Sequence, residues 1–600
     1  MMKRSIFAAL FVYTVRKRKR VFMTCKEMIL SNDYMDLITD YVIPSEYGFD
    51  LAVPYCFQRV EGELGILYVE RENIRNAGIT FNNSFVPKCY GLAQQQSITG
   101  QEVSNEIVFS ETGITTLQNA PLNLTGKNVV IGIIDTGIRY EEEAFLDSFG
   151  RSRILAIWDQ TIQTGEPPEG FLYGTEYTQA QINEALKSDN PREIVPSYDE
   201  NGHGTAMASA AAGGSGRIGS RQPALGAATD CQLVIVKLKE AKQYLRNYYF
   251  IRENTPCFQE NDVILAMQYL QKYVKILSVP MVICFGIETN LGDHTGNGLL
   301  NQYANYVSSK ISRVLITPAG NEGNHAHHFH GNLSEDTVSE GVEIRVGENS
   351  SGFVVDFYGA LPYQYQATIR SPAGESVQVV QQGTSGIYRN QSMIFSFLFE
   401  ATKLYVEYSL VASYSNAQFM RFRFENPVEG VWLITIRVLG NPKMAQFDMW
   451  LPIEEFLSSE VYFLRPEPDI TITEPGLIES AISVATYQPQ TGGIWQESGR
   501  GYARNGRKVP DIAAPGVGIA TILGSRTGSS MSAAITAGAM AQLFQWLVVE
   551  QNEVFADANL MQNLCIRGAS RDQTLVYPNR QWGYGKLNVI GILRYLAGIF

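Results

Sequence analysis

The sequence lacks three features that would place it in other classes of protein. Its 7 cysteines are an odd number and include no Cys-x-x-Cys pair, which argues against a disulfide framework. Asp and Glu (60) outnumber Lys and Arg (48), and no basic stripe occurs beyond the N-terminus, so a general nucleic-acid partner is not expected. The apolar stretch 6–15 is too short to span a bilayer. We therefore expect a globular, acidic protein in a reducing compartment, without a nucleic-acid or membrane partner.

The first residues also lack the pattern of a secretory signal. A strongly basic cluster, 16–20, follows the apolar stretch at the point where a signal peptide carries small residues and a cleavage site. We interpret 1–33 as a non-secretory N-terminal extension. The alternative is that translation starts at Met23 or Met28 and that the preceding residues are an artefact of the assigned start.

Continuous apolar runs alternate with helical patterns from about residue 127 onward, which predicts an α/β fold with a parallel sheet flanked by helices. Asp262 is a good helix N-cap, followed by apolar residues at helical spacing, and a second helix is expected over about 531–548. The predicted strands are 128–134, 232–238, 281–285, 313–317 and 481–486.

Two regions break this rhythm. Residues 326–452 show apolar residues at every second position between turn residues, which predicts an inserted all-β sandwich or jelly roll. Residues 34–96 form a smaller α+β segment, with a strand near 65–69 and a helix near 70–77.

Three glycine-rich segments supply the side chains needed for acyl transfer. Asp135 follows an apolar run in Ile-Asp-Thr-Gly, His203 lies in Asn-Gly-His-Gly-Thr, and Ser530 lies in Gly-Ser-Ser-Met-Ser. A serine hydroxyl needs a histidine to accept its proton and a carboxylate to orient that histidine. Any one of these segments alone is more often a cap or a turn.

These segments, in this order, resemble the subtilisin-like serine proteases (subtilases). The segment 318–323, Pro-Ala-Gly-Asn-Glu-Gly, matches the family motif whose asparagine donates to the oxyanion, which assigns that role to Asn321. The resemblance implies Asp135, His203 and Ser530 as the triad, with the Ser530 backbone N–H as second oxyanion donor at a helix N-terminus.

The resemblance also implies where substrate binds. Gly286, Ile287 and Glu288 stand where the family has its substrate-binding strand, and the segment Pro318, Ala319 and Gly320 is expected to line the same cleft. Glu288 is expected at the pocket rim, where its charge would favour basic or polar substrate side chains.

The run 325–330 holds four histidines, which could bind Zn²⁺ or Ni²⁺. No carboxylate or thiolate cluster accompanies it at a recognisable spacing, so we favour a structural or pocket-edge role. The loop 213–226 lacks the oxygen ligands that Ca²⁺ needs. We expect no obligatory metal and no cofactor.

Within the subtilases, the layout resembles the Csp germination proteases of clostridia. These have a prodomain, a β jelly roll inserted before the serine, and no secretory signal. The resemblance implies a prodomain at 34–96, a core at 97–325 and 453–600, and a jelly-roll insertion at 326–452 that either clamps the core or is passive decoration.

The expected protein is thus a monomeric, cytoplasmic or spore-associated endopeptidase that acts on protein or peptide substrates. Its own prodomain would bind in the cleft and be cut within 89–97. Two alternatives are a pseudoprotease that acts as a scaffold or in signalling, and a zymogen that cleaves only itself.

Overall fold

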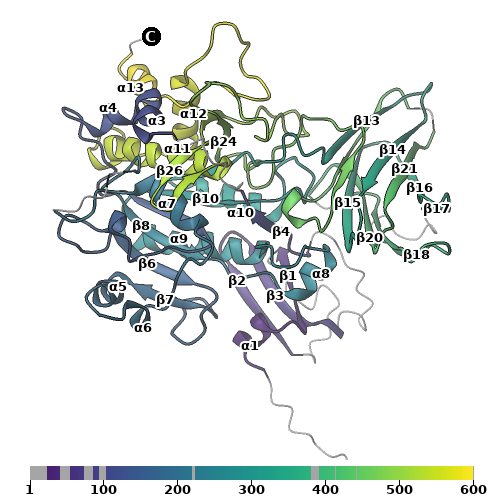
Figure 1. The fold of residues 1–600 in the computed structure, drawn as a ribbon, viewed down its shortest axis with the longest axis horizontal. Helices are drawn as coiled ribbons and strands as arrows, with labels where there is room; N and C mark the ends of the chain where they lie inside the picture. The colour runs from purple at the N-terminus through teal and green to yellow at the C-terminus, as the bar shows by residue number, and fades with distance from the viewer. Residues whose placement is uncertain are drawn as a thin grey trace, which may run out of the picture.

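The structure is a computed structural model, and it shows an α/β core with a β sandwich on one side and a small sheet below it (Figure 1). It describes residues 23–40, 54–72, 85–93, 103–218, 223, 225–379, 391–412, 414–440 and 442–598.

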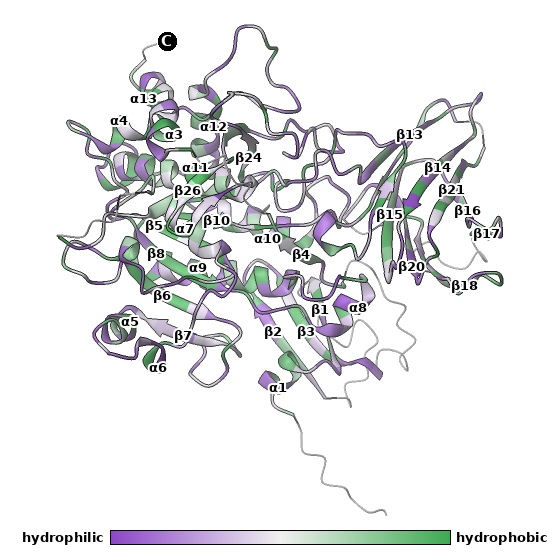
Figure 2. Ribbon diagram, viewed as in Figure 1, coloured by the Kyte–Doolittle hydropathy of each residue, from purple (hydrophilic) through white to green (hydrophobic). Residues whose placement is uncertain are grey.

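The core is built on a sheet of apolar strands that are buried on both faces (Figure 2). The strands lie in the order β25-β24-β12-β10-β5-β8-β6-β7 and are parallel except for the pair β6–β7. Each predicted core strand is present to within two residues at each end. The strands are β5 (Val130–Asp135), β6 (Ile154–Asp159), β7 (Thr175–Thr178), β8 (Gln232–Lys237), β10 (Met281–Phe285), β12 (Arg313–Pro318), β24 (Ile482–Tyr487) and β25 (Ile512–Pro515).

Helices cover both faces of this sheet. One face packs on α7 (His203–Ala212) and α11 (Ser529–Phe544), and the other packs on α9 (Glu260–Leu277) and α10 (Leu299–Ser308). The other core helices are α3 (Asn105–Thr112), α4 (Ile114–Gln118), α5 (Gln179–Ala185), α6 (Pro191–Ile194), α8 (Gln243–Tyr248), α12 (Ala558–Gly568) and α13 (Val589–Leu596), with a 3-10 turn at Glu143–Phe145. The fold is therefore the predicted α/β class.

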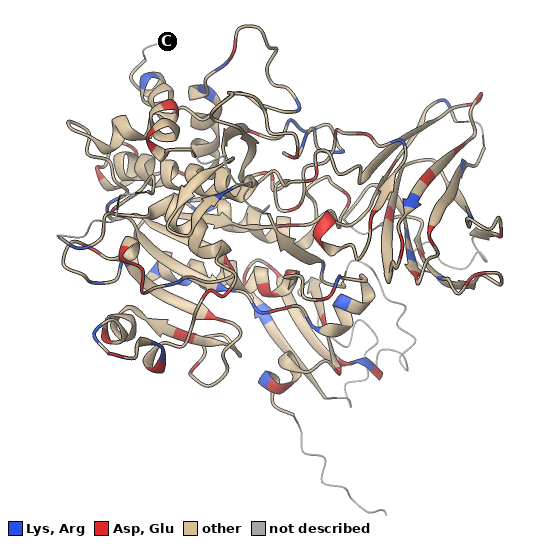
Figure 3. Ribbon diagram, in the orientation of Figure 1, with Lys and Arg blue, Asp and Glu red and all other residues tan. Residues whose placement is uncertain are grey.

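Helix α11 carries no charged residue and continues as a π-helical turn at Gln545–Val549 (Figure 3). The combined segment Ser529–Val549 is long and apolar enough to cross a membrane, but 83% of its most apolar 18-residue stretch is buried inside the protein. It is accordingly the central core helix.

The predicted start of α9 is wrong. The helix begins at Glu260, and Asp262 lies in its first turn instead of capping it. Its carboxylate is buried and is 2.5 Å from Lys239 Nζ, and it accepts a 2.6 Å hydrogen bond from the Tyr173 hydroxyl. A tertiary ion pair, and not the local cap preference, determines the position of this residue.

The insertion is a sandwich of two antiparallel sheets whose inner faces share one apolar core. One sheet has the order β13-β22-β15-β20-β19-β18 and the other β17-β16-β21-β14-β23. The strands are β13 (His328–Leu333), β14 (Ser339–Val346), β15 (Gly352–Ala360), β16 (Tyr365–Arg370), β17 (Ser376–Val379), β18 (Gln391–Ser396), β19 (Lys403–Ser409), β20 (Ala417–Glu425), β21 (Gly430–Val438), β22 (Ala445–Trp450) and β23 (Val461–Phe463). Because β23 belongs to it, the sandwich ends beyond the predicted boundary at residue 452.

The N-terminal unit is a small antiparallel sheet, β1-β3-β2, with one short helix. Its elements are α1 (Cys25–Leu30), β1 (Tyr34–Asp40), β2 (Tyr55–Val60) and β3 (Leu64–Glu70). The expected strand near 65–69 is β3, which includes Glu70, and most of the helix expected near 70–77 falls outside the described residues.

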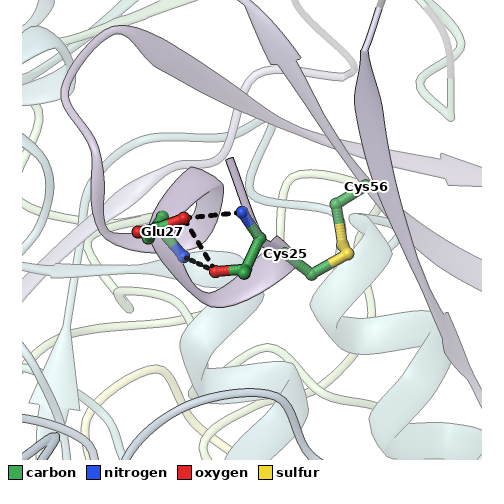
Figure 4. Close-up of a disulfide and its surroundings, with 4 residues drawn as sticks. Cys25, Glu27 and Cys56 are labelled. Atoms are coloured by element: carbon green, nitrogen blue, oxygen red, sulfur yellow. Dashed lines mark hydrogen bonds between the residues drawn. A yellow bond between two sulfur atoms is a disulfide. The ribbon is translucent and has the colours of Figure 1, made fainter. Parts of the chain in front are cut away.

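Two expectations fail in this unit. Helix α1 packs on the sheet with Met28 and Ile29 buried, so the ordered unit begins before residue 34. A disulfide joins Cys25 to Cys56, whose Cα atoms lie 5.3 Å apart (Figure 4). The packing of α1 against β2 brings these two cysteines together, which no spacing pattern reveals. The other cysteines among the described residues are free and buried.

Candidate active site

Three elements of the core bring the predicted acyl-transfer residues together. Asp135 is the last residue of β5, His203 is the first residue of α7, and Ser530 is the second residue of α11. Gly202 and Gly528, which precede the two helices, have φ angles of 86° and 151° that favour glycine. The glycines of the motifs therefore let the chain turn sharply into each helix.

The side chains form one hydrogen-bonded chain. His203 Nδ1 lies 2.9 Å from both carboxylate oxygens of Asp135, and His203 Nε2 lies 2.9 Å from Ser530 Oγ. All three residues are buried, with at most 1% of their surface exposed. A base in contact with a hydroxyl, and a carboxylate in contact with the base, is the arrangement that activates a serine.

Burial and charge act in opposite directions on His203. Burial disfavours the imidazolium and lowers the pKa of His203, but the Asp135 carboxylate and its hydrogen bond leave that pKa above its usual value. The imidazole is therefore a stronger base than a free histidine, as proton abstraction from a serine requires.

A second carboxylate, Asp199, organises the start of α7. It accepts hydrogen bonds from the backbone N–H groups of Gly202 (2.8 Å) and Thr205 (2.9 Å), and from the hydroxyl of Thr205 (2.6 Å). The hydroxyl of Thr136 lies 2.8 Å from Asp199 and 3.1 Å from Asp135. The sequence analysis did not predict a role for Asp199. Its position as an acidic residue three positions before Gly202 is the feature that could have indicated one.

Glycine is required where the cleft floor meets the aspartate. A Cβ on Gly286 would lie 1.8 Å from Asp135 Oδ2 and 2.5 Å from Met207 Sδ. The backbone of 286–288 thus packs directly on the triad, which explains why Gly286 begins this segment.

Asn321 lies beside the serine with a free donor. Its Oδ1 accepts a 3.0 Å hydrogen bond from the Ser529 backbone N–H, which fixes the orientation of the amide. Its Nδ2 is buried and has no hydrogen-bond partner among the described residues. A buried, unused N–H donor next to Ser530 is suited to an oxygen that gains charge during reaction.

The cleft holds the strand β4 (Cys89–Leu92), which pairs antiparallel with β11 (Ile287–Glu288) on one side and β9 (Phe258–Gln259) on the other. The next residue, Ala93, donates its N–H to the Gly286 carbonyl (2.9 Å). The Ala93 carbonyl oxygen accepts a 3.2 Å hydrogen bond from the Ser530 N–H. The chain therefore places one of its own carbonyl groups at the serine.

The expectation for Glu288 is wrong. Its side chain is 3% exposed, and its Oε2 accepts hydrogen bonds from the Asn321 N–H (2.9 Å) and the Thr473 hydroxyl (3.2 Å). Burial, together with the nearby Glu322, raises the pKa of Glu288 well above its usual range. A carboxyl that is buried and hydrogen-bonded inside the protein cannot select basic side chains at a rim.

The residues expected to bind substrate divide into two groups by their backbone contacts. Gly286, Ile287 and Glu288 contact the strand β4–Ala93 through their backbones. Pro318 is the last residue of β12. The two residues that follow it form backbone hydrogen bonds with other segments of the core: Ala319 with Val484 and Thr473, and Gly320 with Gly499.

The histidine run is divided among separate carboxylates that the sequence spacing does not reveal. His327 Nδ1 lies 2.6 Å from Glu322, and His328 and His330 lie 3.2 and 2.7 Å from Asp448. Burial opposes charge on His327, but Glu322 raises its pKa. In the described part of the chain, no group of three or more His, Cys, Asp or Glu is arranged to hold a metal ion.

Comparison with known proteins agrees with this geometry. The model of the subtilase family matches residues 126–338 and 464–585, which cover most of the core and the first sandwich strand, β13. Two Arabidopsis thaliana proteins match over shorter stretches: subtilisin-like protease SBT3.10 (36% identity over 98 residues, 15% of this chain) and subtilisin-like protease SBT1.3 (29% over 168 residues, 26% of this chain). These stretches span only 13% and 18% of the plant proteins.

Among solved structures, the CspB protease of Clostridium perfringens is similar over 82% of this chain and 97% of its own, with 28% identity and a TM-score of 0.70. The likeness thus extends over most of the chain, beyond the segments that the family model matches. The chain belongs to the subtilase family of serine proteases.

Proposed function

We propose that the protein is a serine endopeptidase that is made as a zymogen and cuts its own chain after Ala93. Residues up to Ala93 act as the prodomain, and β4 is its tail, held in the cleft as a substrate would be. Strand addition of this kind supplies main-chain hydrogen bonds to any extended peptide.

One observation carries the proposal: the Ala93 carbonyl oxygen accepts from the Ser530 N–H (3.2 Å), while Ser530 Oγ lies 2.9 Å from the base His203. The peptide carbonyl, the nucleophile and the base therefore meet at one point. The free Nδ2 of Asn321 supplies a second donor for the oxyanion.

The reaction follows from these contacts. His203 Nε2 takes the proton of Ser530 Oγ as Oγ bonds to the Ala93 carbonyl carbon, and Asp135 stabilises the imidazolium. The tetrahedral intermediate breaks the bond to the nitrogen of Gln94, which receives the proton from His203. Water then attacks the ester between Ala93 and Ser530, again with His203 as base, and frees the Ala93 carboxylate.

Intact mass analysis of the purified chain and of Ser530→Ala tests this proposal. The wild type should yield two pieces, one ending at Ala93 and one beginning at Gln94, and Ser530→Ala should remain whole. Wild type that stays whole while folded, or a Ser530→Ala chain that is cut at the same bond, contradicts it.

The proposed physiological role is limited proteolysis that activates another protein, as the resemblance to the Csp germination proteases implies. A fluorophosphonate probe distinguishes this role from a pseudoprotease, because labelling abolished by Ser530→Ala requires an activated serine. The alternative of a zymogen that cleaves only itself is favoured by the burial of Tyr90, Leu92 and Ala93, which a substrate would have to displace.

A further inference from the structure

Between the sandwich strands β22 and β23 the chain passes over the core through the segment Ile453–Phe456, which we call the roof segment. It follows β22 and contains the short 3-10 helix Glu454–Phe456. Ile453 and Phe456 are buried in an apolar cluster that also contains Cys89 of the cleft strand and Met35 of the N-terminal unit. The roof segment thus lies over the strand that occupies the cleft.

The roof segment leaves no space for a side chain at Gly91, the third residue before the proposed cut. A Cβ there would lie 2.6 Å from Ile453 Cδ1, 3.2 Å from Phe456 Cε1 and 3.5 Å from Glu455 Oε2. Gly91 lies within the extended strand β4 and is not at a positive φ, so its backbone suits any residue. Contact with the roof segment, and not backbone conformation, therefore disfavours a side chain here, because the buried side chain of Ile453 would have to shift.

The roof segment is held by the core and not only by the prodomain. The Arg252 N–H donates to the Phe456 carbonyl (2.9 Å), and the Thr255 hydroxyl donates to the Glu455 carbonyl (3.2 Å). The Glu454 N–H donates to Glu322 (3.0 Å), the residue next to Asn321. The same steric limit would therefore meet any peptide that replaces the prodomain tail.

The roof segment also offers the bound strand a polar contact. Glu455 Oε2 would lie 3.5 Å from a Cβ on Gly91, and burial raises the pKa of Glu455 while the Leu92 backbone N–H and the charge of His203 lower it. On one edge, β4 is paired with β11. An extended peptide is thus held by the backbones of β11 and β9 along its two edges, and the roof segment packs over it.

We infer that the roof segment makes glycine a requirement at the third position before the cleaved bond. The substrates of this site are polypeptides with an exposed, extended stretch that resembles the Tyr-Gly-Leu-Ala of 90–93. This specificity rests on the proposed function, because it describes what the same site cuts.

Ile453→Val allows a direct test, because it removes Cδ1, the atom closest to the added methyl group, at small cost to the core. In the full chain, Gly91→Ala should slow self-processing at least about tenfold, as overpacking of a dense site does. Adding Ile453→Val should restore the rate to within about threefold of wild type. Adding Ile436→Val, the same change inside the sandwich core, should not restore it.

Processing of Gly91→Ala at the wild-type rate, or a slow variant that Ile453→Val leaves slow, overturns the inference. Recovery in the double variant also excludes misfolding as the cause of the slow rate. A second readout does not depend on catalysis: in a Ser530→Ala chain, Gly91→Ala should lower the melting temperature by at least about 2 °C, and Ile453→Val should reverse this. If that shift is present but wild type is never cut, the steric contact stands and the proposed protease function fails.

Discussion

Asp36 should control whether the prodomain stays in place after processing. It lies in β1, and its side chain is fully buried at the contact with the core. Its carboxylate accepts from Lys242 Nζ and from Gln259 Nε2, each at 2.5 Å, and its own N–H donates to the Tyr244 hydroxyl (2.9 Å). Asp36→Ala removes the carboxylate and leaves Lys242 buried without its charge partner.

The size of the effect follows from the burial of this pair. Burial already lowers the pKa of Lys242, and Asp36 is the charge that opposes this shift. Loss of one partner of a buried ion pair costs about 3–5 kcal/mol, because the remaining charge stays desolvated. Once the chain is cut, the same free energy is lost from the binding of the prodomain to the core. The affinity of the prodomain for the core should therefore fall about 100- to 5,000-fold.

The assay is co-elution of the two pieces in size-exclusion chromatography after processing. Wild-type prodomain should co-elute with the core, and Asp36→Ala prodomain should separate from it. Before the cut, the covalent link keeps the prodomain at high effective concentration, so the variant should still fold and process. Asp33→Ala, which changes an exposed residue of the same unit, is the matched control and should behave as wild type.

Retention of the Asp36→Ala prodomain at wild-type affinity would refute this reasoning. The double change Asp36→Leu with Lys242→Met separates the charge effect from a loss of packing. Since it removes both charges, it should recover much of the affinity that Asp36→Ala loses. Equal loss in the single and double variants would show that shape, and not charge, holds the prodomain.

Four further results are expected at the cleft. Asn321→Ala should slow self-processing about 100- to 1,000-fold, measured by intact mass over time, because an oxyanion donor is lost. The processing rate should rise with pH as His203 becomes neutral, with an inflection above about pH 6.5, because Asp135 holds the pKa of His203 above its usual value. The pKa of Glu455 is raised to about 7, mainly by burial, and its ionised form favours the imidazolium, so Glu455→Gln should move that inflection to lower pH; an unchanged profile would contradict this contact. Glu288→Gln should leave the melting temperature and the substrate profile nearly unchanged, because burial raises the pKa of the carboxyl it replaces well above its usual range and so favours the neutral form; a new preference among peptide substrates would restore the rim hypothesis.

The core and its reactive residues could be predicted because their signals are local. A strand buried on both faces needs a continuous apolar run, so β5, β8 and β10 are visible in the sequence. Asp135 stands at the end of such a run, His203 stands directly after Gly202, and Ser530 stands two residues after Gly528, where each glycine turns the chain into a helix. Each reactive side chain is thus marked by its own neighbours.

The remaining features depend on contacts between distant segments. Cys25 meets Cys56 only because α1 packs on β2, and Glu288 turns inward because the Asn321 N–H and Thr473 offer it hydrogen bonds. The periodicity of apolar residues predicts that a residue lies in a strand. It does not predict which buried group its side chain will contact. The direction of the Glu288 carboxyl, and hence its charge, therefore could not be inferred from its position in the motif.

The insertion could be assigned as β structure from its sequence, but its connection to the cleft could not. The alternating pattern that reveals β14 and β21 ends before the roof segment, which is short and has no repeat. Yet this segment places Glu455 near His203, and Glu454 donates to Glu322 beside Asn321. A passive decoration would contact the core away from the triad, whereas this insertion sends the roof segment, between β22 and β23, over β4 and to Glu322. We therefore expect changes in the sandwich that shift the roof segment to alter which peptides are cut before they alter the stability of the core.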